Sequence, residues 1–414
     1  MNTLAPNVDA APAVGTPEWR LLIATARLEL DDHWAAEFRQ VLGHKLDWET
    51  VITQSLIHGT AGLLLRHLAA APDYIEIPAE VMERLRAIHL RLTASGMQML
   101  AQFHLFAWDL GEAGVPTIVL KGAALAERLY GDVGLRPMSD IDLIIREADW
   151  PEICKVLKKF NYSSVEQELG PLPPKLTKYD IQTHVQFVSP ANTCLEFQFD
   201  LFTLGIGMFD MPGVWRRSRE AGTANPGVRF LSPEDELLHL LVHANRHGCT
   251  RLKWLVDIAE SLRQNGVINW DLLEDIARRE KVTVIVHQTL MHVERLLGVK
   301  LVDAAILERF APARYQGLAW NLLWPRQQLD EFRGRTEDGV CYYCYRPASG
   351  WNLLNFALMG RVRDKMIYQA RWIVPSLDWM AQTFDQPKSL RLLRYYPMRL
   401  RERNRKKLPV EFEK

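Results

Sequence analysis

The 414-residue chain has few cysteines, no long hydrophobic run and no excess of charge of either sign. Its five cysteines are too few and too scattered for a framework of disulfide bonds, so a reducing compartment, the cytoplasm, is expected. No stretch of about 18 apolar residues occurs, so no transmembrane segment is expected. The start lacks a basic segment followed by an apolar run, so no signal peptide is expected. The 50 basic residues equal the 50 acidic ones, which argues against a uniformly polybasic nucleic-acid binder.

The bulk composition is that of an ordinary globular protein, with 48% apolar and 24% charged residues. It excludes wholesale disorder and a collagen-like fibre, and the length suggests two or three domains. Apolar residues follow helical spacing on both sides of a small mixed unit, which predicts an α+β fold. The predicted parts are a disordered tail, a helical region, a mixed α/β core, a helical domain and a basic C-terminal segment, at residues 1–17, 18–110, 111–204, 205–385 and 386–414.

The mixed core contains the clearest local signals. Residues 116–120 are a short β-branched run, which predicts a buried strand that ends at Lys121-Gly122. A predicted helix and a loop containing Gly and Pro lead to a second strand over residues 140–146. A further helix and three strand candidates follow, over residues 150–160, 162–167, 183–189 and 193–202.

Two aspartates alternate along the second strand. Side chains two residues apart on a strand share a face, so Asp140 and Asp142 are expected to point the same way, about 7 Å apart. Ile141 and Leu143 then face the opposite side, where a helix could cover them. Two like charges on one face repel each other, and a divalent cation removes that cost. Mg²⁺ is the expected ion, with Mn²⁺ as the alternative, because Mg²⁺ prefers one or two carboxylates plus substrate phosphates.

A second acidic strand follows the first. Glu196, Gln198 and Asp200 alternate there with apolar residues, which is the pattern of a half-buried strand. If the two strands are neighbours, Glu196 or Asp200 supplies a third carboxylate, and three acids can hold two Mg²⁺ ions for an in-line displacement. Lys121-Gly122 lies at a strand-to-helix turn, where glycine lets a phosphate approach the backbone and lysine adds a cation.

Each of these signals is weak on its own. An Asp-x-Asp sequence is common at surfaces and turns, and Lys-Gly is less specific still. The full order is far more specific: a strand, Lys-Gly, a helix, a loop, Asp-x-Asp on a strand and then an acidic strand. We interpret this set as a site that binds phosphate and metal.

These residues resemble the family of uncharacterised nucleotidyltransferases in the polymerase-β-type superfamily. The family shows a Lys-Gly turn, an aromatic-Gly-Asp stretch and then Leu-Arg-Pro-x-x-Asp-Ile-Asp-Leu. The corresponding segments here are residues 121–122, 130–132 and 135–143. Later family motifs match Leu-Ser-Pro-Glu-Asp at 231–235 and Arg-Leu-Lys-Trp-Leu-Val-Asp at 251–257, so the likeness covers most of residues 18–400.

The resemblance implies a small mixed sheet flanked by N-terminal and C-terminal helical regions. It implies that Asp140 and Asp142 are the metal-binding pair and that Glu196 is the third carboxylate, with Asp200 as the alternative. The residues implied in nucleotide binding are Lys121, Gly122, Arg136, Ser139, His184 and His243. The chain departs from the family pattern at Gln198, where a histidine is usual, and glutamine cannot titrate.

Some of these residues have simpler interpretations. Arg136 either orients phosphates or pairs with Asp132 or Asp140. His184 either contacts a phosphate or is a polar residue on a strand face. Three histidines, His239, His243 and His247, are expected on one face of a helix. They could line the cleft, bind a metal ion or simply form hydrogen bonds within the helix.

The implied function is transfer of an NMP group from an NTP, with ATP as the expected nucleotide, to an acceptor hydroxyl. The acceptor is a small molecule, a peptide or an RNA end, and pyrophosphate leaves in a two-Mg²⁺ mechanism. One alternative is a non-catalytic nucleotide-binding or regulatory module. Another is a phosphotransferase acting on a peptide or small molecule, although the chain has neither a Walker Gly-rich loop nor a His-Arg-Asp motif.

The neutral total charge hides an uneven distribution. Residues 388–407 carry nine Lys or Arg and one Glu, so this segment has a charge of +8 and the rest of the chain has −8. Leucines and tyrosines interleave with the basic residues. The segment is a candidate to bind a polyanion or an anionic membrane surface. The alternative is a solvated end that packs partly on an acidic body.

Overall fold

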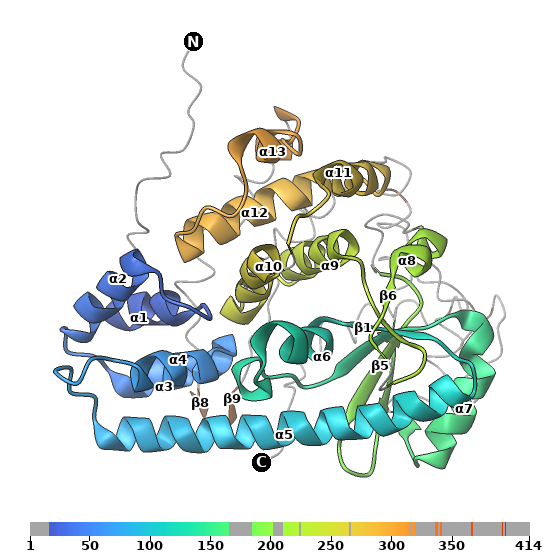
Figure 1. Ribbon diagram of the computed structural model, residues 1–414, viewed down its shortest axis with the longest axis horizontal. Helices are drawn as coiled ribbons and strands as arrows, with labels where there is room; N and C mark the ends of the chain where they lie inside the picture. Colours follow the sequence, from blue (N-terminus) through green and yellow to red (C-terminus); the bar gives the residue numbers. More distant parts are fainter. Residues whose placement is uncertain are drawn as a thin grey trace.

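The computed structural model describes residues 16–164, 184–201, 210–222, 225–264, 266–314 and 316–318, with a few isolated positions beyond residue 335. Five helices form the N-terminal region, as the apolar spacing predicts: α1 (Pro17–Thr25), α2 (Asp32–Leu42), α3 (Trp48–His58), α4 (Ala61–Ala69) and α5 (Ala79–Glu112). Asp31 and Asp47 cap α2 and α3 by accepting backbone N–H hydrogen bonds at 2.9 and 3.3 Å. The 34-residue α5 runs along one side of the molecule (Figure 1). In the described part of the chain, no helix combines the length and the apolar character that crossing a membrane requires.

A seven-stranded mixed sheet follows α5 along the chain. Its strand order is β3-β4-β5-β2-β1-β7-β6. The strands are β1 (Thr117–Leu120), β2 (Ile141–Ile144), β3 (Ser163–Ser164), β4 (His184–Val188), β5 (Cys194–Gln198), β6 (Arg219–Glu220) and β7 (Val228–Phe230). β1 pairs antiparallel with β2 and parallel with β7, while β2 pairs parallel with β5. The predicted α+β fold is confirmed, and so are the five strands expected from the sequence.

The sheet is wider than the sequence predicts. The expected core ends near residue 204, but β7 lies beside β1 and β6 lies beside β7, so the sheet also takes strands from the segment that follows. These strands are only three and two residues long, which is too short for apolar and polar residues to show an alternating pattern.

Short helical turns connect the central strands. α6 (Lys121–Leu125) follows β1 directly and continues as the π-helical turn η1 (Ala126–Tyr130), which leads to the 3₁₀ turn η2 (Val133–Leu135) before β2. After β2, the 3₁₀ turn η3 (Glu147–Asp149) precedes α7 (Trp150–Lys159). Asp149 immediately precedes α7, but its side chain makes no capping hydrogen bond because the residue already lies in η3 with helical backbone angles.

One face of the sheet packs against α5 and α7. Ile141, Leu143, Leu195 and Phe197 alternate with the acidic residues of β2 and β5 and are completely buried. They join one apolar cluster with side chains of α5 and α7, in which the ring of Phe106 lies 6.1 Å from that of Phe197. The prediction that a helix covers Ile141 and Leu143 is therefore confirmed, and the acidic residues face the opposite side of the sheet.

The C-terminal helices are α8 (Met211–Arg217), α9 (Pro233–Arg246), α10 (Leu252–Gln264), α11 (Trp270–Arg279), α12 (Thr283–Leu297) and α13 (Ala304–Glu308). Helices α9 and α10 lie over that opposite side of the sheet, and α11 and α12 pack against α9 (Figure 1). α9 begins as the sequence predicts: Ser232 accepts a hydrogen bond from the Asp235 N–H at 3.2 Å, and proline occupies the first turn.

Several predictions fall on parts of the chain that the structure does not describe. Almost all of the predicted tail, the end of the predicted helical domain and the basic segment lie outside the described residues. Beyond residue 335, the described positions include two short paired strands, β8 (Thr336–Glu337) and β9 (Val340–Cys341).

Candidate active site

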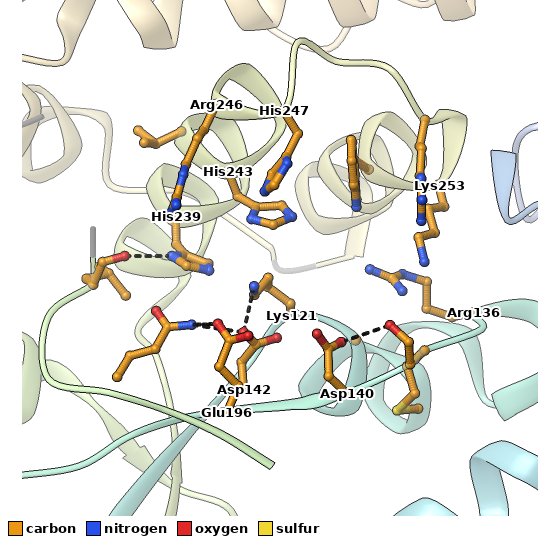
Figure 2. A pocket seen from close by; sticks show the side chains of 18 of the residues that line it. Lys121, Arg136, Asp140, Asp142, Glu196, His239, His243, Arg246, His247 and Lys253 are labelled. Carbon is orange, nitrogen blue, oxygen red and sulfur yellow. Dashed lines mark hydrogen bonds and ion pairs between the residues drawn. The ribbon is translucent and has the colours of Figure 1, made fainter. Parts of the chain in front are cut away.

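A cavity of about 470 Å³ lies between the polar face of the sheet and helices α9 and α10. The strand side supplies three carboxylates, Asp140, Asp142 and Glu196, which we call the acidic floor. The helix side supplies what we call the helical wall: His239, His243, Arg246, His247, Arg251 and Lys253. Figure 2 shows the two groups facing each other across the cavity, with Lys121 between them.

The acidic floor is built by strand register. Asp142 on β2 lies opposite Glu196 on β5, and Glu196 lies opposite Gln186 on β4. On the other side, Asp142 lies opposite Leu120, the last residue of β1, so Lys121 emerges beside it. These residues form one row across four strands, and the two acidic strands are neighbours, as the third carboxylate required. Asp140 immediately precedes β2 and also points into the cavity (Figure 2).

Donors from three sides hold the floor carboxylates in place. The Lys121 ammonium lies 2.7 Å from Asp142 Oδ1. The Gln198 amide donates to the same oxygen at 2.9 Å and to Glu196 Oε1 at 3.0 Å. The Gln186 amide donates to Glu196 Oε2 at 3.0 Å, and the Ser139 hydroxyl donates to Asp140 Oδ1 at 3.3 Å.

Burial of so many charges perturbs their protonation. The pKa of Asp142 is raised to about 8, mainly by burial; the Lys121 charge opposes this shift, and the charges of Asp140 and Glu196 add to it. Burial alone would lower the pKa of Lys121, but the three carboxylates raise it, and Asp142 contributes most. The floor is therefore a place where positive charge is favoured.

The helical wall has the opposite character. His239, His243 and His247 follow one another at four-residue intervals on α9 and at its end, with ring centroids 6.1 and 4.6 Å apart. The Trp254 ring lies 5.4 Å from His243 and 5.0 Å from His247. Burial lowers the pKa of His239 and of His247 to about 3 and that of His243 well below its usual value, so these imidazoles are neutral near pH 7.

Lys253, on the wall, has a lowered pKa and is therefore only partly protonated near pH 7. Burial lowers the pKa of Lys253 to about 7, helped by the charges of Arg136 and Arg251. Its ammonium donates to the Pro137 carbonyl at 3.2 Å, on the loop that precedes the acidic floor.

A buried ion pair joins the two sides of the cavity. The Arg136 guanidinium donates to both carboxylate oxygens of Asp257 on α10, at 2.6 to 3.0 Å, and the Tyr130 hydroxyl donates to the same carboxylate at 2.7 Å. The expected pairing of Arg136 with Asp132 or Asp140 is therefore wrong. The actual partner lies 121 residues later in the sequence, on an element that only the tertiary fold brings close.

The cavity brings together most of the site residues expected from the sequence. The expected residues that line it are Lys121, Gly122, Arg136, Ser139, Asp140, Asp142, Glu196 and His243. Asp200 is not among the described lining residues, because β5 ends at Gln198 and the chain turns before Asp200. His184 lies on β4 opposite Gln198, and its side chain is outside the described set.

Sequence reasoning missed five polar residues of the cavity. These are Gln186, Arg246, Thr250, Arg251 and Lys253. Two of them carried a usable signal: Gln186 alternates with the apolar residues of β4, and Arg246 lies three residues after His243 on the same helix face. Arg251 and Lys253 flank the start of α10, so no helical spacing relates them to the three histidines.

The described residues include no group of three His, Cys, Asp or Glu side chains that converge as a ready-made metal site. A metal site of the three wall histidines therefore has no support in that part of the chain. In the acidic floor, the Lys121 ammonium lies among the carboxylates. Asp140 and Asp142 nevertheless fit a divalent ion, because burying neighbouring carboxylates is costly and each keeps one oxygen without a hydrogen-bond donor in the described structure.

Comparison with known families agrees with this arrangement. A family model described as uncharacterised nucleotidyltransferase matches residues 44–298, which is more than half of the chain. The chain belongs to this family of uncharacterised nucleotidyltransferases. The matched span runs from just before α3 to the end of α12 and so includes both sides of the cavity. Searches of curated proteins and of solved structures found no match.

Membership of a nucleotidyltransferase family supports nucleotidyl transfer as the general activity and an NTP as a plausible substrate. The family name specifies neither the nucleotide, nor the metal, nor the acceptor. Those choices depend on the chemistry of the cavity.

Proposed function

We propose that this protein transfers the NMP group of an NTP to the hydroxyl group of an acceptor, in a reaction that depends on a divalent metal ion. The observation that carries the proposal is the opposition of the acidic floor and the helical wall across one cavity of about 470 Å³. A metal-bound nucleotide is positively charged at its cation and negatively charged at its phosphates, so it matches both sides at once.

The phosphates have a plausible place on the cationic side. Arg246, Arg251 and Lys253 line the helical wall, and Lys121 with Gly122 lines the turn after β1. A side chain at Gly122 would have a Cβ only 3.2 Å from Met138 Cβ, so glycine keeps this turn open. ATP is the nucleotide we expect, because it is the commonest cellular NTP donor.

The reaction is an in-line displacement. The acceptor hydroxyl oxygen forms a bond to the α-phosphorus, the bond from that phosphorus to the bridging oxygen of the β-phosphate breaks, and pyrophosphate leaves with the electron pair. Asp140 and Asp142 would hold the divalent ion, which when bound would neutralise charge on the phosphate oxygens. In this proposal Glu196 receives the hydroxyl proton, directly or through water. Its hydrogen bond with the Gln198 amide, which also donates to Asp142, supports the role by orienting its carboxylate. The helical wall orients the leaving phosphates, and its neutral imidazoles supply hydrogen bonds without adding charge.

Intact-mass measurement of acceptors tests the proposal. The protein is incubated with Mg²⁺ and each NTP in turn, with small hydroxyl compounds, peptides and RNA ends as acceptors. An added NMP supports the proposal. An added phosphate indicates a phosphotransferase instead. Nucleotide binding with no product from any acceptor, together with an altered activity of a partner protein, indicates a regulatory module.

The basic segment 386–414 lies almost entirely outside the described residues, and we propose it as a site for a polyanionic acceptor or an anionic surface. Removing residues 388–414 should weaken acceptor binding and make it less dependent on salt. Unchanged acceptor affinity would mean that the uneven charge has no role in binding.

A further inference from the structure

Hydrogen bonds already occupy most oxygen atoms of the acidic floor. Glu196 accepts one side-chain amide on each oxygen, from Gln198 and from Gln186, both at 3.0 Å. Asp142 Oδ1 receives both the Lys121 ammonium and the Gln198 amide. Within the described residues, the oxygens that accept no hydrogen bond are Oδ2 of Asp140 and Oδ2 of Asp142.

The charge of the floor also limits the number of ions. Carboxylates must be ionised to bind a metal ion, and with all three ionised the floor, including the Lys121 ammonium, has a net charge of −2. One divalent ion balances the charge of the floor, so the charge of a second ion would have to be balanced by the nucleotide alone. A second ion would also need carboxylate oxygens of its own. Donors from Lys121, Ser139 and the two glutamines already occupy four of the six oxygens of the floor.

We infer that the cavity binds one divalent ion with its nucleotide, on the free oxygens of Asp140 and Asp142, and that the Lys121 ammonium takes the place of a second ion. This inference rests on the proposed nucleotidyl transfer and departs from the two-ion mechanism expected from the sequence. Glu196 then acts through its hydrogen bonds to the two glutamines and not as a metal ligand.

The fold keeps Lys121 in this position. Lys121 follows the last residue of β1, and that residue is in register with Asp142, so the lysine side chain starts beside its partner. The Lys121 backbone is left-handed, with φ +47°, and its side chain is only 15% exposed. Moving the ammonium away would leave Asp142 without its cation, and freeing Glu196 would leave two amide donors without their acceptor. Such losses are unfavourable because a buried polar group is left unsatisfied.

Counting bound Mn²⁺ tests the inference directly. Electron paramagnetic resonance measures the free Mn²⁺ that remains when the ion is titrated into a mixture of full-length protein and an NTP analogue whose α,β bridging oxygen is replaced by methylene. Protein is kept in excess of the analogue, so that every nucleotide is bound. We expect one tightly bound ion per protein–analogue complex. Two ions of comparable affinity in the unmodified protein would overturn the inference, and this measurement needs no variant.

Variants then show whether Lys121 is responsible for that count. Lys121→Met removes the charge at nearly constant volume, and we expect the complex to bind a second ion, or to bind the first about tenfold more tightly. Lys121→Arg keeps the charge and should keep the count at one. Lys155→Met is a matched control, because Lys155 is an exposed lysine whose ammonium pairs with Glu152 away from the cavity. An unchanged count and affinity in Lys121→Met would contradict the assigned role.

A gain of function provides an independent check. Gln198→Glu replaces the amide that bridges Asp142 and Glu196 with a fourth carboxylate, so a second ion should bind even when Lys121 is present. A variant that still binds one ion, with unchanged affinity, would contradict the charge argument.

The ion count and the reaction can fail separately. Product formation with two bound ions would refute the single-ion inference and leave nucleotidyl transfer intact. One bound ion with no NMP transfer to any acceptor would refute the proposed function and leave the ion count intact.

Discussion

The acidic floor and the helical wall face each other across one cavity, but different forces hold them in place. The floor is a row of side chains on neighbouring strands, where backbone register puts Asp142 opposite Glu196 and hydrogen-bond donors hold each carboxylate. The wall is a helix face on which burial keeps imidazoles neutral and leaves arginines to supply the charge. The negative charge of the floor is therefore concentrated on a few carboxylates and partly balanced by Lys121. The positive charge of the wall is spread over several side chains.

This difference assigns different tasks to the two sides. A compact pair of carboxylates suits a metal ion, whose binding requires oxygen atoms at fixed positions. A broad surface of cations and neutral donors suits a triphosphate, which presents many oxygen atoms and tolerates variation in position. Loss of a floor residue should therefore abolish the reaction, whereas loss of a wall residue should weaken binding by a small factor.

The largest effect is expected at the floor. Replacing Asp140 and Asp142 together by asparagine keeps their shape and removes the charge that binds the ion, so kcat for NMP transfer should fall at least about 10³-fold. The measurement is the rate of product formation by mass spectrometry, with circular dichroism to confirm folding. Asp271→Asn is the matched control, since that side chain is 88% exposed. Full activity in the double variant would mean that the site is assigned to the wrong residues.

The contrast between the two sides also explains how much the sequence could predict. The floor was predictable because strand alternation is a local pattern: it placed Asp140 and Asp142 on one face and Glu196 on the next acidic strand. Asp200 fitted the same alternation, but the strand ends two residues earlier, and the end of a strand depends on pairing that one sequence does not reveal.

The wall was only partly predictable. Four-residue spacing put His239, His243 and His247 on one helix face, but tertiary packing decides which face of a helix lines a cavity. The partner of Arg136 could not be predicted, because Asp257 lies on a separate helix and no local pattern links the two residues.

The buried ion pair that joins the floor and the wall should contribute strongly to the free energy of unfolding. Arg136 and Asp257 are 4% and 1% exposed, so Asp257→Ala leaves a buried arginine without a counter-charge. We expect the free energy of unfolding to fall by about 3 kcal/mol or more, measured by urea denaturation. The control is Asp271→Ala, which removes an exposed carboxylate paired with Arg309 and should cost under about 1 kcal/mol. Equal losses in the two variants would show that the buried pair does not join the two sides.

The buried, neutral histidines of the wall should make the folded protein less stable at low pH. The pKa of His239 is lowered from 6.5 to about 3, mainly by burial and then by the Lys121 charge. Between these pH values the unfolded chain binds a proton that the folded chain does not, so stability is lost as pH falls from about 6.5 toward 3. At pH 4, His239 alone would account for a loss of about 3 kcal/mol.

A variant isolates this contribution. His239→Gln has no imidazole to protonate, so its stability should fall less between pH 7 and pH 4 than that of the unmodified protein. Urea denaturation at both pH values measures the difference. The exposed His33 provides the control His33→Gln, which should retain the full loss. The same loss in His239→Gln would show that this histidine is already charged in the folded state.

The smallest effect is expected at Lys253, on the edge of the wall nearest the floor. Its pKa of about 7 results from burial and from the nearby charges of Arg136 and Arg251, opposed by Asp257 and Asp140. The ammonium is therefore present at pH 6 and largely lost at pH 8, and the KM for the NTP should rise about threefold over that interval. Lys253→Met should have the higher KM at both pH values and lose the pH dependence, with kcat nearly unchanged. Lys155→Met should behave as the unmodified protein does. A pH-dependent KM that persists in Lys253→Met would place the titrating group elsewhere and leave the wall with only its arginines for binding phosphate.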